Sequence, residues 1–189
     1  MSIHKTNESH SPPKGGLKKH KIITSFGTAF IKPGEPLYTE IVDIGKYIAE
    51  GGCSICSGGY SGSMEAISKG AISAGGYTVG IGVKGNKSKP NEYLKEFILA
   101  ENLMERILML INKADAFIIF RGGTGTLLEI SATLELMNKK AISEKKMIFY
   151  SDFWSSMIEI LKQDSEELNS LIERNVIFIS SPEKIKEYV

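Results

Sequence analysis

The chain has 189 residues, of which 42% are hydrophobic and 24% are charged, and its formal net charge is +1. These values are typical of one globular domain with a substantial core, and they provide no overall field that would attract nucleic acid or a membrane surface. Because the sequence has neither a membrane-length apolar run nor the apolar core of a signal peptide, we expect a cytoplasmic protein that binds neither membranes nor nucleic acid.

The first 19 residues are polar and rich in Pro, Gly, Ser and Lys, which predicts a disordered arm ahead of one domain spanning residues 20–189. All three histidines of the chain, His4, His10 and His20, lie within the first twenty residues. The body of the domain therefore lacks a histidine for a catalytic triad or a metal site. Its chemistry must use carboxylates, arginine, lysine, hydroxyls or backbone amides.

From residue 20 onward, short apolar runs alternate with segments of helical spacing. In residues 35–52, for example, Ile41, Ile44 and Ile48 share one helical face, and a glycine pair ends the pattern. This alternation predicts an α/β fold, a single three-layer α/β/α Rossmann-like domain with a central parallel sheet, whose ligands bind where the strand order reverses. The expected strands are 20–27, 53–58, 77–83, 115–120, 146–150 and 176–180, with a short apolar run at 96–101, and the expected helices are 35–52, 63–76, 102–114, 126–140, 152–163 and a short one from Pro182.

The two cysteines, Cys53 and Cys56, have the C-x-x-C spacing of a redox pair or of half a zinc site. They lie in a predicted strand, where side chains alternate, so we expect them to point to opposite faces of the sheet. The sequence has no second cysteine pair to complete a zinc site. We therefore expect no metal site, and a redox role is the weakest of the functional hypotheses.

Two predicted strand-to-helix loops, residues 56–66 and 120–129, are rich in glycine. The second lacks both the Lys-Ser/Thr pair of a Walker loop and the third glycine of the dinucleotide fingerprint. Glycine lets the backbone approach a ligand, and the helix that each loop opens favours an anion, so we expect a phosphorylated ligand, most simply a nucleotide. The alternative is that both loops are only tight turns. The candidate binding residues are Gly58, Gly59, Ser61, Gly62, Met64, Arg121, Gly122, Gly123, Thr124, Gly125 and Thr126.

Glu129 follows the second loop and is a candidate catalytic residue. A carboxylate beside a phosphate is repulsive unless it faces another part of the ligand, such as the ribose of a nucleoside monophosphate. There it can stabilise the positive charge that develops when an N-glycosidic bond breaks, or orient the attacking water. The alternative is structural, because Glu129 follows Thr126 at capping-box spacing.

Arg106 is the second candidate, since it lies in the first turns of a predicted helix at the edge where ligands bind. Its guanidinium could clamp a phosphate or hold Glu129 in place. A solvated arginine paired with Glu101 or Glu105 is an equally open alternative.

These segments together carry a resemblance to a known family. The stretch RGGTGTLLE resembles the PGGxGTxxE motif of the LOG (LONELY GUY) family, long mislabelled lysine decarboxylase. The stretch MERILMLINKADAFIIF is similar to the M-x-x-R-K segment of that family, and SGGYSGSMEAISKGAISAGGYTVGIG is similar to its other glycine loop. The resemblance covers about residues 20–180.

The resemblance implies a Rossmann-like homodimer that hydrolyses the N-glycosidic bond of an AMP-like nucleoside 5′-monophosphate to free base and ribose 5-phosphate. It assigns catalysis to Arg106 and Glu129 and phosphate binding to residues 122–126, and it implies no metal or organic cofactor. The chain departs from the pattern, because Arg121 replaces the motif proline, Ile107 replaces a lysine, and Glu65 brings a second carboxylate near the site. These departures keep open an alternative, a non-catalytic nucleotide-binding protein or a carrier or sensor of the molybdenum-cofactor type.

Overall fold

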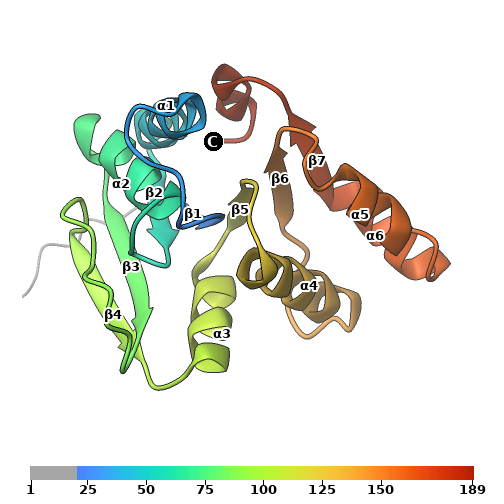
Figure 1. Ribbon diagram of the computed structural model, residues 1–189. Helices are drawn as coiled ribbons and strands as arrows, with labels where there is room; N and C mark the ends of the chain where they lie inside the picture. The colour runs from blue at the N-terminus through green and yellow to red at the C-terminus, as the bar shows by residue number, and fades with distance from the viewer. Residues whose placement is uncertain (1–20) are drawn as a thin grey trace, which may run out of the picture.

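The computed structural model describes residues 21–189, in which seven strands form one parallel sheet in the order β4-β3-β2-β1-β5-β6-β7 (Figure 1). The expected α/β, Rossmann-like class is thus confirmed, whereas the predicted arm of residues 1–19 lies outside the described residues. The strands are β1 (Ile22–Phe26), β2 (Ser54–Ser57), β3 (Thr78–Val83), β4 (Glu96–Ala100), β5 (Ala116–Ile119), β6 (Lys146–Tyr150) and β7 (Val176–Ile179).

Helices cover both faces of the sheet, because its strands are apolar on both sides (Figure 1). One buried cluster joins the sheet to α3, α4, α5 and α6, and the other joins it to α1, α2 and the C-terminal η1. Cys56 belongs to the first cluster and Cys53 to the second, which confirms that they face opposite sides. The helices are α1 (Pro36–Glu50), α2 (Ser63–Ser73), α3 (Leu103–Lys113), α4 (Thr124–Asn138), α5 (Ser155–Leu161), α6 (Glu166–Asn175) and the 3₁₀ helix η1 (Pro182–Glu187).

Helix α6 is absent from the elements expected from the sequence. Its start carries the usual signals: the Ser165 side chain accepts a hydrogen bond from the backbone N–H of Leu168 at 3.3 Å, and acidic residues fill the first turn. Leu168, Leu171 and Ile172 then form its buried face. The segment is so polar overall that this narrow apolar stripe is easily overlooked.

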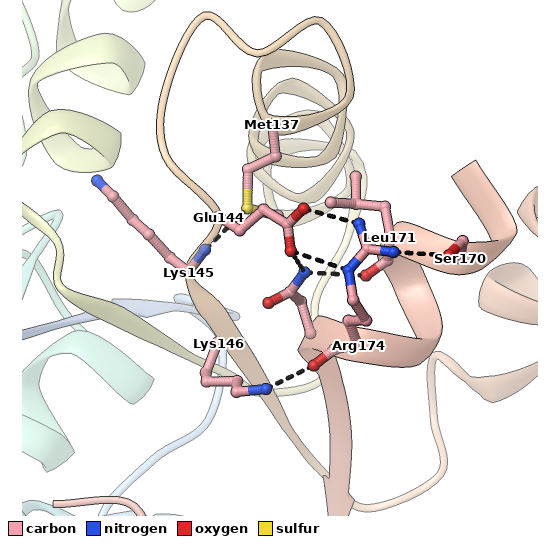
Figure 2. A network of polar contacts seen from close by, with 8 residues as sticks. Met137, Glu144, Lys145, Lys146, Ser170, Leu171 and Arg174 are labelled. Atoms are coloured by element: carbon pink, nitrogen blue, oxygen red, sulfur yellow. Dashed lines mark hydrogen bonds and ion pairs between the residues drawn. The ribbon is translucent and has the colours of Figure 1, made fainter. Parts of the chain in front are cut away.

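A polar network ties α6 to the segment that leads into β6 (Figure 2). Arg174 donates to both carboxylate oxygens of Glu144, at 3.2 and 2.7 Å, and the Asn175 amide donates to Glu144 Oε2 at 2.6 Å. The hydrogen bonds from Arg174 and then Asn175 lower the pKa of Glu144 to about 2. A hollow of about 690 Å³ lies beside this network, but Glu144 and Arg174 in its wall already neutralise each other, which indicates a structural role.

Helices α1 and α2 approach closely because glycine stands at their contact. A Cβ added at Gly70 would overlap the backbone carbonyl of Val42, so Gly70→Ala should lower the free energy of unfolding by about 2 kcal/mol or more. Urea denaturation measures this loss. The matched control is Gly125→Ala, also in a helix, where an added Cβ meets no atom within 4 Å. Equal midpoints for Gly70→Ala and wild type would contradict the packing argument.

Candidate functional site

A pocket of about 250 Å³ opens at the carboxyl ends of β1 and β5, which are neighbours in the sheet although α1 and α4 follow them on opposite faces. The strand order reverses here, and this is where open α/β sheets bind ligands. The wall comes from the segment after β1 and the loops after β2 and β5, and from α3 and α4. The lining residues are Ser25, Phe26, Gly27, Thr28, Ala29, Phe30, Gly58, Met64, Arg106, Gly123, Thr124, Gly125, Thr126 and Glu129.

Glu129 reaches the pocket from the second turn of α4. The helix begins at Thr124 after Gly123, two residues earlier than expected, and its N-terminus has no side-chain cap. Glu129 therefore does not form a capping box with Thr126, so that part of the structural alternative is wrong. Its side chain is 12% exposed and lies on the pocket wall.

Arg106 reaches the same point from the first turn of α3. Its Nε donates to the carbonyl oxygen of Ile81 in β3, at 2.7 Å, and its Nη1 lies 3.7 Å from Glu129 Oε1. Like Glu129, the Arg106 side chain is nearly buried, with 13% exposed. The Ile81 carbonyl thus orients the guanidinium, and the guanidinium lies beside the Glu129 carboxylate.

The acidic residues that could have paired with Arg106 are engaged elsewhere. Glu105 accepts a hydrogen bond from the backbone N–H of Glu101 at 2.6 Å, and Glu101 itself pairs with Lys84. The solvated-arginine alternative is therefore wrong: the guanidinium turns inward, toward Glu129.

Burial raises the pKa of Glu129 to about 7, although the nearby Arg106 cation acts in the opposite direction. The separation of 3.7 Å is longer than a hydrogen bond, so the ion pair lacks the direct contact that would hold the carboxyl firmly ionised. Near neutral pH this carboxyl is present in both protonation states. It can stabilise a neighbouring cation and take a proton from water.

The loop after β2 contributes one close approach to Arg106. A Cβ added at Gly58 would overlap Arg106 Nη2 and lie 2.6 Å from the sulfur of Met64, so only glycine leaves the guanidinium in place. Gly58 and Met64 line the pocket, but the other candidates of this loop do not. Ser61 donates instead to the carbonyl of Ala29 at 3.2 Å, and Gly59 and Gly62 pack against neighbouring backbone.

In the loop after β5, too, some candidate residues line the pocket and others do not. Gly123 to Thr126 line the pocket, whereas Gly122 packs under the Thr126 side chain and Arg121 is exposed outside the pocket wall. The carbonyl of Arg121 accepts a hydrogen bond from the backbone N–H of Thr28 at 3.0 Å. The structure thus brings Arg106, Glu129 and four of the loop residues together, and it leaves Arg121 and Gly122 beside them.

The segment after β1 is part of the site although the sequence analysis did not single it out. Gly27 to Phe30 line the pocket, together with Ser25, whose buried hydroxyl has no hydrogen-bond partner within residues 21–189. The sequence feature that could have identified this segment is the run of small and polar residues directly after a buried strand.

Glu65 does not bring a second carboxylate to the site, contrary to expectation. It accepts a hydrogen bond from the Tyr38 hydroxyl of α1 at 2.7 Å and is absent from the pocket wall. Ile107, the other departure from the family pattern, is buried in the core.

Within residues 21–189, no three His, Cys, Asp or Glu side chains gather where a metal ion could bind. Over the same range, no helix combines the length and the apolar character needed to cross a membrane.

Comparison with known proteins gives a family and several relatives. The model of the SLOG cluster4 family, LDcluster4, matches residues 20–184. An uncharacterized protein of Archaeoglobus fulgidus is 35% identical over 101 residues, 53% of this chain and 66% of the relative. Proteins of Mycobacterium marinum and Mycobacterium tuberculosis named cytokinin riboside 5′-monophosphate phosphoribohydrolase are 29% and 30% identical over 102 residues. Those matches span half of this chain and 54%, about half, of each mycobacterial protein.

Solved structures show a second set of similarities. The molybdenum cofactor binding protein of the phototrophic bacterium Rippkaea orientalis has a TM-score of 0.70 and 25% identity, covering 90% of this chain and 96% of its own. The molybdenum cofactor carrier protein of Chlamydomonas reinhardtii has a TM-score of 0.67 at 20% identity, covering 89% and 95% of the two chains. At that identity the second likeness concerns the fold alone.

Proposed function

The chain belongs to the SLOG cluster4 family, and from this membership we propose that it is a nucleoside 5′-monophosphate phosphoribohydrolase. It hydrolyses the N-glycosidic bond of an AMP-like nucleotide to free base and ribose 5-phosphate. The names of the mycobacterial relatives support this activity at the level of the family. The observation that carries the proposal is the nearly buried ion pair of Arg106 and Glu129 on the wall of a pocket that also contains the open glycine loop.

The phosphate binds at the start of α4, where free backbone N–H groups and the helix dipole favour an anion. Gly123 to Thr126 supply these amides, and Thr124 adds a hydroxyl. Glu129 lies five positions beyond Thr124, about 7.5 Å farther along the helix axis at 1.5 Å per residue. That offset allows the ribose, rather than the phosphate, to face the carboxylate.

In the reaction, the bond between C1′ and the base nitrogen breaks and its electron pair leaves with the base. The Glu129 carboxylate stabilises the positive charge that develops on the ribose. Water forms the new C1′–O bond and its proton passes to Glu129, the departing base takes up one proton from solvent, and Glu129 then releases its proton to solvent, so that one water is consumed for each bond broken. Arg106 holds the carboxylate toward the sugar, since its own orientation is fixed by Ile81.

The proposal is tested by incubating the pure protein with AMP, with N6-substituted AMP and with adenosine, and measuring free base by chromatography. We expect release from the monophosphates and at least about tenfold less from adenosine, because adenosine lacks the charge-assisted hydrogen bonds of the phosphate. No release from any monophosphate would contradict the proposal.

A molybdenum-cofactor-type carrier or sensor is a second candidate, favoured by the 25% identity to the Rippkaea protein over nearly the whole chain. The described residues offer no metal-ligand cluster, so such a cofactor would be held through its organic part by the same loops. This candidate predicts saturable binding without product. The inward-facing Glu129 favours the hydrolase, because a carboxylate of raised pKa can take up a proton during turnover, a property that binding alone does not use.

A homodimer is also part of the proposal. Helices α3 and α4 are neighbours (Figure 1), and both carry exposed apolar side chains: Leu103, Met104, Leu108, Leu127 and Leu128. Sedimentation of the pure protein measures whether a second copy of the chain covers them.

Gly125→Ala should weaken AMP binding about tenfold or more without destabilising the fold. Gly125 lines the pocket, and a Cβ there meets no protein atom within 4 Å, so the added methyl group obstructs only a ligand. Gly125 is the second residue of α4, and none of the positive-φ glycines is Gly125, so alanine fits the backbone there. Calorimetric titration measures the AMP affinity of the variant, and urea denaturation measures its stability. Unchanged AMP affinity would place the phosphate elsewhere.

A further inference from the structure

The Phe30 side chain is 89% exposed and lies on the wall of the pocket. A single exposed apolar residue is common on protein surfaces and needs no explanation by itself. Phe30 differs in its position, because it is the only exposed aromatic ring among the described residues that line the pocket. The other ring on this wall, Phe26, is buried in the core.

The backbone that carries Phe30 is fixed on several sides. Its N–H donates to the Thr28 hydroxyl at 3.1 Å, and the Thr28 carbonyl accepts from both the backbone N–H and the hydroxyl of Ser63, each at 2.9 Å. The next residue, Ile31, is buried and anchors the segment. The backbone of Phe30 is therefore held at a defined place at the pocket, which keeps the exposed ring near it.

The size and polarity of the pocket indicate that the base of the ligand extends to the pocket mouth, where Phe30 lies. Its volume of about 250 Å³ is below the roughly 300–1,000 Å³ of pockets that enclose a whole ligand. The polar groups of α4 and the pair of Arg106 and Glu129 account for the phosphate and the ribose. The base must then project toward the mouth, where an apolar, planar partner is needed.

We infer that Phe30 is the platform on which the heteroaromatic base of the ligand stacks. The inference rests on the proposed binding of a nucleoside monophosphate, and it adds the residue that recognises the base. Aromatic rings stack on any nucleobase because every base has a π-face, and the ring of Phe30 has no competing partner in the described structure. Phe30 thus selects a planar base without fixing its hydrogen-bonding pattern.

The test compares two ligands that share the sugar and the phosphate: AMP, and ribose 5-phosphate, which lacks the base. Titration calorimetry is done with Phe30→Ala, Phe30→Trp and the parent chain, all carrying Glu129→Gln to prevent turnover. Stacking on an aromatic side chain corresponds to roughly a five- to hundredfold change in affinity. We expect Phe30→Ala to weaken AMP binding about tenfold and ribose 5-phosphate binding less than twofold, and Phe30→Trp to retain AMP affinity.

Equal losses for both ligands, or unchanged AMP affinity in Phe30→Ala, would overturn the inference. A change of oligomeric state with an equal loss for both ligands also overturns it, since Phe30 would then belong to an interface between copies. A parent chain that binds AMP no better than ribose 5-phosphate overturns it as well. Hydrolysis is decided separately by base release from wild type, so AMP bound on Phe30 but never cleaved contradicts the proposed function alone.

Discussion

In the proposed hydrolase, we expect Glu129→Gln to lower kcat for AMP by about a thousandfold, a loss within the range for removal of a catalytic acid–base or charge-stabilising group. Glutamine keeps the shape of the side chain but carries no charge to stabilise the ribosyl cation and takes no proton from water. The pKa of Glu129, raised to about 7 by burial, adds a second expectation. We expect wild-type kcat to rise with pH through about 7, because only the ionised carboxylate is active in the proposed mechanism. Stopped-time assays of free adenine from pH 5 to pH 9 measure both.

Urea denaturation across the same pH range provides the control for this variant. The folded state binds the Glu129 proton more tightly than the unfolded chain, whose glutamate has its ordinary pKa of 4.5. Stability from this group is therefore complete below about pH 4.5 and is lost as the pH rises through about 7. Relative to wild type, Glu129→Gln should gain stability as the pH rises from 5 to 8. Undiminished base release by a folded Glu129→Gln chain would contradict the assigned role.

We expect Arg106→Gln to lower kcat at pH 7 by about a hundredfold, since the carboxylate loses the group that the proposed mechanism assigns to aiming it at the sugar. The Arg106 cation lowers the pKa of Glu129, so its removal raises that pKa further. The midpoint of the pH–rate profile should therefore move upward, a change that a merely structural arginine would not produce. Arg106→Lys keeps the charge but not the planar fork that bonds to Ile81, so it should restore the midpoint better than it restores kcat.

Two measurements distinguish a catalytic effect of Arg106→Gln from a loss of folding or of binding. The denaturation midpoint shows whether Arg106→Gln is folded at the assay temperature, and titration with AMP separates lost affinity from lost turnover. A folded variant with reduced kcat and an unchanged pH midpoint would contradict the coupling between Arg106 and Glu129.

The sequence predicts the sheet well because its inner strands are buried on both faces and have continuous apolar runs, as in β5 and β6. It predicts α6 poorly, because that helix buries only a narrow stripe within a polar segment. The strand order is a property of long-range pairing, such as that of β1 with β5 across about ninety residues, which local spacing does not encode.

Some features of the site can likewise be predicted from the sequence, and others cannot. Arg106 and Glu129 can be selected from the sequence because each follows a predicted strand at the ligand-binding edge. Their approach to 3.7 Å, the bond to Ile81 and the place of Phe30 depend on how separate loops pack. Arg121 shows the limit of motif reasoning, because its position in the motif suggested ligand binding but its exposed side chain lies outside the pocket wall.

The most direct test of the hydrolase is a mass balance of AMP with the purified wild-type protein at pH 8, where most of the Glu129 carboxyl is ionised. Adenine, ribose 5-phosphate, adenosine and inorganic phosphate are quantified together over several turnovers. We predict one adenine and one ribose 5-phosphate for each AMP consumed, with neither adenosine nor phosphate formed. AMP recovered intact after saturable binding would contradict the account and leave a carrier or sensor in its place.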